Sequence, residues 1–237
     1  MSGLLAGETV ECVIEGAPRR IRFLNPEAGL IDLDHPIPLH FSAMGPKSRA
    51  LTAELGAGWI GIAAQVPAAE TAIAEMQQAW RAAGRESGDL HATAFTAGCV
   101  LAENEPADSP RAKAQAGPFA AVPLHEMVEA SERGRLNMGA SPALAQALDR
   151  YRSIHAGCGA AAPYLDLHRG HTLFLRPEEA DVITGDLIRE MTFTATAPEL
   201  RERLRALARA GFRQVAVLIV EGQEDMLEDW ARVIEGV

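Results

Sequence analysis

Residues 36–64 read PIPLHFSAMGPKSRALTAELGAGWIGIAA, and this stretch decides the fold. Two short apolar runs, residues 37–44 and 59–64, have the length of buried strands. Residues 45–48 (GPKS) form a turn that opens a helix, because proline suits a first helical turn, and Gly56 ends that helix. A strand, a tight turn, a helix and a second strand predict the βαβ unit of a parallel sheet.

The rest of the chain extends this pattern. Residues 9–14 and 20–24 flank a turn at 15–18 and predict an antiparallel hairpin. Apolar runs at 91–101 and 214–220 bring the predicted parallel strands to four. A polar, proline-rich break is predicted at 103–118. Helices are predicted at 68–84, in pieces of 119–156, at 177–189, after a cap formed by Thr196 and Glu199, and at 225–234. The sequence therefore predicts an α/β protein with a long helical crossover.

Composition excludes several classes of protein. The 237 residues are 48% hydrophobic and 23% charged, which is ordinary for a globular chain. The net charge of −10 argues against a general binder of nucleic acid or anionic membranes. The three cysteines are far apart, which argues against a disulfide scaffold and a zinc site and favours a reducing compartment. With no apolar run near ~20 residues, we expect no membrane span and a cytoplasmic protein.

The turn at 45–48 has the chemistry of an anion site. A helix start offers free N–H groups and the positive end of the helix dipole. Gly45 lets a ligand approach the backbone, and the Lys47 ammonium and Ser48 hydroxyl can add charge-assisted hydrogen bonds. The alternative interpretation is an ordinary Gly-Pro helix start with an exposed lysine.

Three stretches together resemble one family. They are GPKSRALTAELGAGWI, YLDLHRGHTLFLRPEE and TFTATAPELRERLRALARAGFRQVAVLIVEGQEDMLEDWARV. Their order and spacing are similar to those of luciferase-like oxidoreductases that depend on flavin or deazaflavin, in the branch labelled methylenetetrahydromethanopterin reductase-like. The resemblance runs from about residue 4 to the end of the chain.

The resemblance implies a partial (β/α)8 barrel that contains the last four parallel strands, with the cofactor at their carboxyl ends. On this alignment, residues 1–35 are a hairpin segment, 36–102 hold strands five to seven, 103–192 are a helical insertion, and 193–237 are the last helix-strand-helix unit. The chain would be a truncated member, without the first four strands. It departs from the family pattern at Ala57-Gly58, where the family has Asp-Gly, and at Thr194-Ala195-Thr196, where it has Thr-Gly-Thr.

The resemblance also implies which residues hold the cofactor. The turn at 45–48 becomes the phosphate site of FMN or a deazaflavin, and the cofactor-binding residues are Met44, Gly45, Pro46, Lys47 and Ser48. The cofactor ring would carry the redox chemistry, so no catalytic side chain is predicted. The substrate is expected to be a small organic molecule.

The loop at 164–171 is the second candidate region. His168, His171 and Tyr164 could line a substrate or cofactor entrance, or hold the loop by hydrogen bonds. His168 and His171 could ligate a metal only with further ligands, and none is suggested nearby, so no metal site is predicted.

Two functions stay open at this point. The first is an oxidoreductase, either a monooxygenase or a hydride-transferring reductase, that uses reduced flavin or deazaflavin. The second is a non-catalytic remnant of the family that binds flavin or forms oligomers. Since four strands cannot close a barrel, the sheet would have two open edges. We therefore expect a homo-oligomer or a complementing half-barrel chain.

Overall fold

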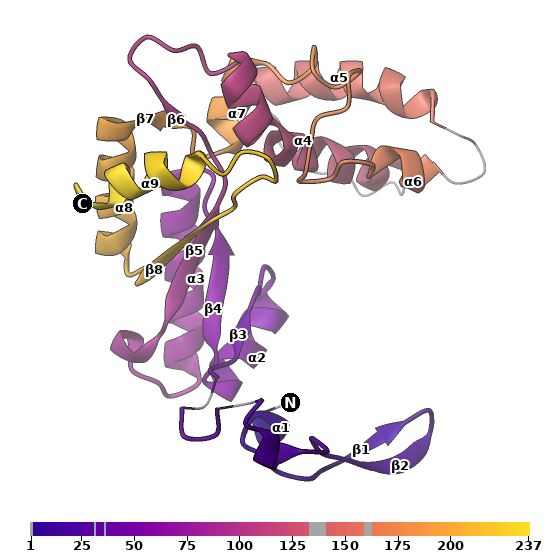
Figure 1. The fold of residues 1–237 in the computed structure, drawn as a ribbon, viewed down its shortest axis with the longest axis vertical. Coiled ribbons are helices and arrows are strands. Elements are labelled where there is room, and N and C mark those ends of the chain that lie inside the picture. The colour runs from indigo at the N-terminus through magenta and orange to yellow at the C-terminus, as the bar shows by residue number, and fades with distance from the viewer. Residues whose placement is uncertain (1, 31, 36, 133–140, 159–162) are drawn as a thin grey trace.

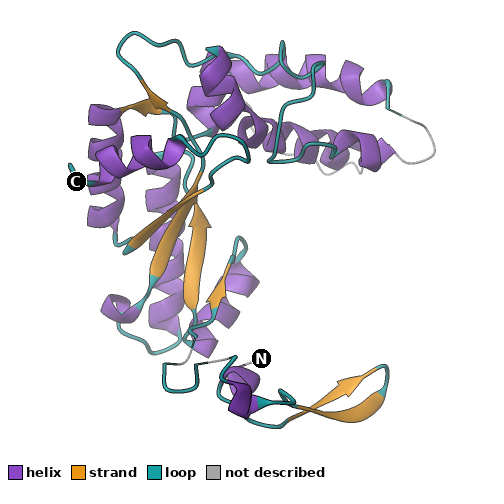
Figure 2. Cartoon of the chain, viewed as in Figure 1, coloured by secondary structure: helices purple, strands orange, loops and turns teal. Residues whose placement is uncertain are grey.

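The computed structural model describes residues 2–30, 32–35, 37–132, 141–158 and 163–237. The chain forms an arch (Figure 1). The N-terminal hairpin lies at one end, a parallel sheet with its helices forms the middle, and a helical region between residues 102 and 193, called the insertion below, forms the other end (Figure 2). No helix in the described ranges is long and apolar enough to cross a membrane.

The N-terminal segment contains the predicted hairpin. After α1 (Ser2–Leu5), strands β1 (Val10–Ile14) and β2 (Ala17–Ile21) pair antiparallel with Ile14 opposite Ala17. The connection is two residues, shorter than the predicted turn at 15–18. Glu15 and Gly16 have φ angles of 51° and 76°, and positive φ at both positions matches the right-handed twist of a two-residue hairpin. The short 3-10 helix η1 (Pro26–Ala28) follows.

The parallel sheet confirms the α/β class. Its strands run in the order β3-β4-β5-β8, all parallel, and their bounds are β3 (His40–Phe41), β4 (Gly58–Ile62), β5 (Ala92–Thr96) and β8 (Gln214–Val217). Among the described residues, β3 and β8 each pair with one neighbour, so both sheet edges are open as predicted. The first strand covers only two residues of the predicted 37–44, and Pro38, which has no N–H for a strand ladder, limits its amino end.

The predicted strand at 91–101 is two strands. After β5, strand β6 (Val100–Leu101) leaves the main sheet and pairs with β7 (Ala195–Thr196). Gly98 permits this change of partner. A Cβ on Gly98 would lie 2.6 Å from the carbonyl carbon of Phe193, so only glycine allows the two backbones to approach this closely.

Helices α2 (Pro46–Leu55), α3 (Val66–Ala82) and α8 (Ala197–Ala210) cover one face of the sheet, and α9 (Met226–Ile234) packs on α8 (Figure 1). A one-turn 3-10 helix, η2 (Ser87–Asp89), precedes β5. The core between helices and sheet contains Trp59, Trp80 and Trp230, and Trp59 stacks on Phe212 at 5.8 Å between ring centroids. The predicted cap of α8 is confirmed, because the Glu199 carboxylate accepts the Thr196 N–H at 2.9 Å.

The insertion has a second core of its own. Its helices are α4 (Pro110–Glu132), α5 (Pro142–Ala156), α6 (Pro163–Leu167) and α7 (Gly185–Met191). The predicted break at 103–118 is therefore wrong from Pro110 onward, and α4 continues through Pro118 and Pro123. Burial of a continuous apolar face outweighs the loss of two backbone hydrogen bonds. Gly134 and Gly139, two other predicted breaks, lie outside the described residues.

Two more predictions in the insertion need correction. Residues 164–171 are not all loop, since α6 occupies the first four of them. The predicted helix at 177–189 is limited to α7, which begins after Thr184, whose hydroxyl accepts the Leu187 N–H. Residues before it form turns, because Glu179 binds the backbone and side chain of Arg176 within a buried cluster.

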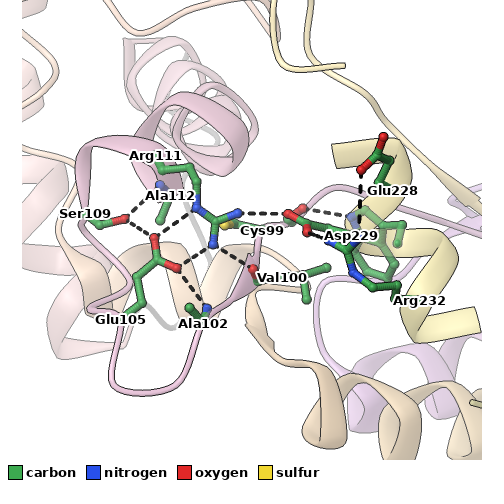
Figure 3. A network of polar contacts seen from close by, with 12 residues as sticks. Cys99, Val100, Ala102, Glu105, Ser109, Arg111, Ala112, Glu228, Asp229 and Arg232 are labelled. Carbon is green, nitrogen blue, oxygen red and sulfur yellow. Dashed lines mark hydrogen bonds and ion pairs between the residues drawn. The ribbon is translucent and has the colours of Figure 1, made fainter. Parts of the chain in front are cut away.

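The insertion joins the sheet region through Arg111 at the start of α4 (Figure 3). Its guanidinium binds the Glu105 carboxylate, the Val100 carbonyl oxygen at 2.9 Å and the Asp229 carboxylate at 2.9 Å. One side chain thus connects α4, β6 and α9. The hydrogen bond from Arg111 lowers the pKa of Glu105 to about 2.

Candidate functional site

The predicted anion turn lies at the carboxyl end of β3, an edge strand. Helix α2 begins at Pro46, as predicted. The side chain of Met44 is 57% exposed just before it. Gly45 has an extended backbone with φ at −105°, and a Cβ there would meet no heavy atom within 4 Å. The space in front of the turn is therefore open, and the packing of the chain does not itself require glycine.

The Ser48 hydroxyl is engaged within the turn. It donates to the Gly45 carbonyl oxygen at 2.9 Å and accepts the Gly45 N–H at 3.2 Å. What the turn offers an anion is the exposed Lys47 ammonium and the N–H groups of Lys47 and Ser48, which have no carbonyl partner within the helix because they lie in its first turn. Arg49 forms an ion pair with Glu75 instead.

The sheet face away from the helices carries partly exposed apolar side chains. Trp59 points into the helix-covered core, so the alternating residues Ile60 and Ile62 point to the other face. Ile60 is half-buried and Ile62 is 45% exposed.

Cys99 follows the carboxyl end of β5, and burial raises the pKa of its thiol to about 12. The thiol is therefore protonated at neutral pH and is a poor nucleophile.

The predicted histidines lie elsewhere, in the insertion. The structure brings His168 and His171 together with His125 of α4, and not with the turn at 44–48. The Nδ1 atom of His171 lies 3.1 Å from Nδ1 of His125 and 3.5 Å from Nδ1 of His168. Burial, together with the other two imidazoles, lowers the pKa of His171 and favours its neutral form. Tyr164 is part of α6, and its side chain lies outside the described residues.

Two carboxylates bind the outer nitrogens of this cluster. His168 Nε2 lies 2.8 Å from Glu129 Oε1, and His125 Nε2 lies 3.3 Å from Glu179 Oε1. Burial opposes ionisation of Glu179, but hydrogen bonds from His125, Arg176 and Tyr151 outweigh it and lower its pKa to about 2.

His125 is a member of the cluster that was not predicted from the sequence. The available signal was HEMVE at 125–129, which places His125 and Glu129 one helical turn apart on a single face. Nothing local connects that helix to residues 168–171.

The family of the chain follows from its sequence match. The family model of luciferase-like monooxygenases covers residues 3–214. The chain belongs to the luciferase-like monooxygenase family. The resemblance stated from the sequence motifs is thus confirmed. No curated protein matches the chain.

One solved structure supports this fold, and a second is a weaker match. The coenzyme F420-dependent tetrahydromethanopterin reductase from Methanopyrus kandleri matches with a TM-score of 0.55 and 17% identity, covering 96% of this chain and 57% of the reductase. The FMN-bound oxygenating constituent of 3,6-diketocamphane monooxygenase from Pseudomonas putida has a TM-score of 0.46 and 12% identity. The match covers 98% of this chain and 57% of the monooxygenase constituent. The luciferase-like chain thus spans little more than half the length of these proteins.

Proposed function

We propose that this luciferase-like chain binds reduced FMN or a deazaflavin and takes part in the oxidation or reduction of a small organic substrate. The observation that carries the proposal is the open start of α2 at the carboxyl end of a parallel strand, in a chain of this family. In parallel α/β folds, ligands bind at the carboxyl ends of the strands. The cysteine pattern is the basis for adding a cytoplasmic location to the proposal.

The phosphate of the cofactor fits the turn. Open space in front of Gly45 admits a phosphate oxygen to the backbone. The N–H groups of Lys47 and Ser48 would donate to it, and the Lys47 ammonium would neutralise its charge. The Ser48 hydroxyl would act mainly by holding the turn, because both of its hydrogen bonds go to Gly45. Pro46, which has no N–H, would fix the first helical turn.

The ring of the cofactor, when bound, supplies the redox chemistry. Met44 and Ile62 are exposed apolar side chains near the carboxyl ends of β3 and β4, and they would contact its apolar part. Because β3 and β8 each pair with a single strand in the part of the chain that the structure describes, we propose that strands from a second copy or a complementing half-barrel chain complete the pocket.

Cofactor titration of variants tests the phosphate assignment. Lys47→Ala should weaken binding of FMN or coenzyme F420 about 10-fold, since a charge-assisted hydrogen bond contributes roughly 1.5 kcal/mol. The matched control is Arg209→Ala, which removes an exposed positive charge from the last turn of α8. Equal affinity of the two variants, measured by fluorescence titration, would refute the assignment.

The open sheet also favours a second candidate function, a cofactor-binding or oligomerising protein without catalysis. Four strands provide only part of a barrel pocket. Turnover assays with reduced cofactor distinguish the two candidates. Binding of the oxidised cofactor without oxidation of the reduced form by any acceptor supports the non-catalytic function.

A further inference from the structure

We infer that His125, His168 and His171 form a binding site for a divalent transition-metal ion of the zinc class, with the three Nδ1 atoms as ligands. The site joins α4 to the segment after α6. It is separate from the anion turn and independent of the proposed redox function.

The positions of the nitrogens fit one ion. Ligand atoms of the three histidines all lie within 4.8 Å of one another, and two of the Nδ1 pairs are 3.1 and 3.5 Å apart. Zn–N bonds of about 2.0–2.1 Å at tetrahedral angles place two nitrogens about 3.3 Å apart. The separations of 3.1 and 3.5 Å in the structure lie on either side of this value.

The hydrogen bonds of the Nε2 atoms to carboxylates leave the Nδ1 atoms of His125 and His168 free to act as ligands. An ionised carboxylate only accepts hydrogen bonds, so Nε2 of His125 donates to Glu179 and Nε2 of His168 donates to Glu129. In the neutral imidazoles, Nδ1 of each then carries a lone pair that faces His171. Histidines that bind metals commonly donate their other N–H to a carboxylate in this way, which fixes the ring and raises its basicity.

A single hydrogen atom cannot satisfy all three nitrogens, whereas a metal ion can. If His171 carries its hydrogen on Nδ1, that hydrogen can lie close to only one of the two neighbouring lone pairs. A metal ion accepts all three lone pairs at once. A metal site is therefore distinguished from a hydrogen-bonded histidine cluster by the binding of an ion, which can be measured.

The donor set defines the class of ion. Three imidazoles suit zinc, cobalt, nickel and copper, whereas calcium and magnesium prefer oxygen ligands. The side chain of His168 is 39% exposed, so an ion can enter from solvent, and water can take the fourth tetrahedral position.

Titration of the metal-free chain of 237 residues with Zn²⁺ and Co²⁺ tests the site. We expect one ion per chain and a visible Co²⁺ spectrum typical of four-coordinate nitrogen and oxygen ligands. His168→Ala should weaken binding more than about 100-fold, since even an outer-shell partner contributes about 10–100-fold. Glu129→Gln, which changes the carboxylate that accepts the hydrogen bond from His168 Nε2, should weaken binding within that smaller range.

The controls keep the test independent of folding. His168 is partly exposed, so its variant should keep the far-UV circular dichroism of the parent even if a variant of the buried His125 does not. His35→Ala removes an exposed histidine that also contacts a carboxylate, Asp32, and should bind Zn²⁺ like the parent. Unchanged affinity in His168→Ala, no uptake by the parent, or a thiolate-to-cobalt absorption band from the cysteines would each overturn the proposal.

Discussion

The sheet region and the helical insertion are stabilised in different ways. The sheet packs one face against α2, α3 and α8 through an almost entirely apolar core, and leaves its other face partly exposed. The insertion buries polar groups among its apolar side chains, and His125, Tyr151, Arg176 and Glu179 form one connected cluster. The sheet region thus offers an open turn suited to an anion, and the insertion offers a preorganised set of donors suited to a cation.

The largest expected effect is in the buried cluster of the insertion. Glu179→Ala removes the buried carboxylate that pairs with Arg176 and should lower the free energy of unfolding by about 3–5 kcal/mol. The control is Glu178→Ala. Glu178 lies 3.4 Å from the same guanidinium but is half-exposed, so its loss should cost less than about 1 kcal/mol. Denaturant unfolding measures the free energy of unfolding of both variants. Similar losses in the two would show that the buried ion pair does not stabilise the insertion more than an exposed one.

The junction of the two regions should be sensitive to acid. Because hydrogen bonding to Arg111 lowers the pKa of Glu105 to about 2 from its ordinary 4.5, the carboxylate stabilises the folded chain above pH 4.5. That contribution is lost as the pH falls from 4.5 through about 2. Glu105→Gln should therefore cost roughly 1–3 kcal/mol at pH 7 and less at pH 3.

The pH prediction is checked by comparing unfolding midpoints of the parent and the variant at the two pH values. Glu103→Gln is the matched control, since Glu103 is an exposed carboxylate two residues away. A Glu105→Gln effect that does not shrink at pH 3 would mean that the charge of Glu105 does not hold the junction.

The same contrast explains what the sequence could predict. The start of α2, the Thr196–Glu199 cap and the hairpin depend on neighbouring residues, and local patterns predicted all three. The end of β5 depends on the approach of Phe193 to Gly98, which is 95 residues away in the chain, and the prediction there was wrong.

The site shows the same limit. Residues 44–48 are contiguous, so one motif indicated them. The histidine cluster requires α4 to pack beside residues 168–171, which are over 40 residues further on, and α4 itself runs through two prolines that predicted breaks. Only the packed structure identifies His125 as the third member.

The cofactor assignment can be tested by adding a single methyl group at the proposed phosphate site. Gly45→Ala meets no atom of the chain within 4 Å at a permitted φ, so stability should stay within about 0.5 kcal/mol of the parent. If a phosphate oxygen contacts this backbone, the affinity for FMN or coenzyme F420 should fall about 10-fold or more, while Gly88→Ala, another glycine with open space, leaves it unchanged. A parent protein that binds the cofactor and a Gly45→Ala variant that binds it equally well would contradict the account.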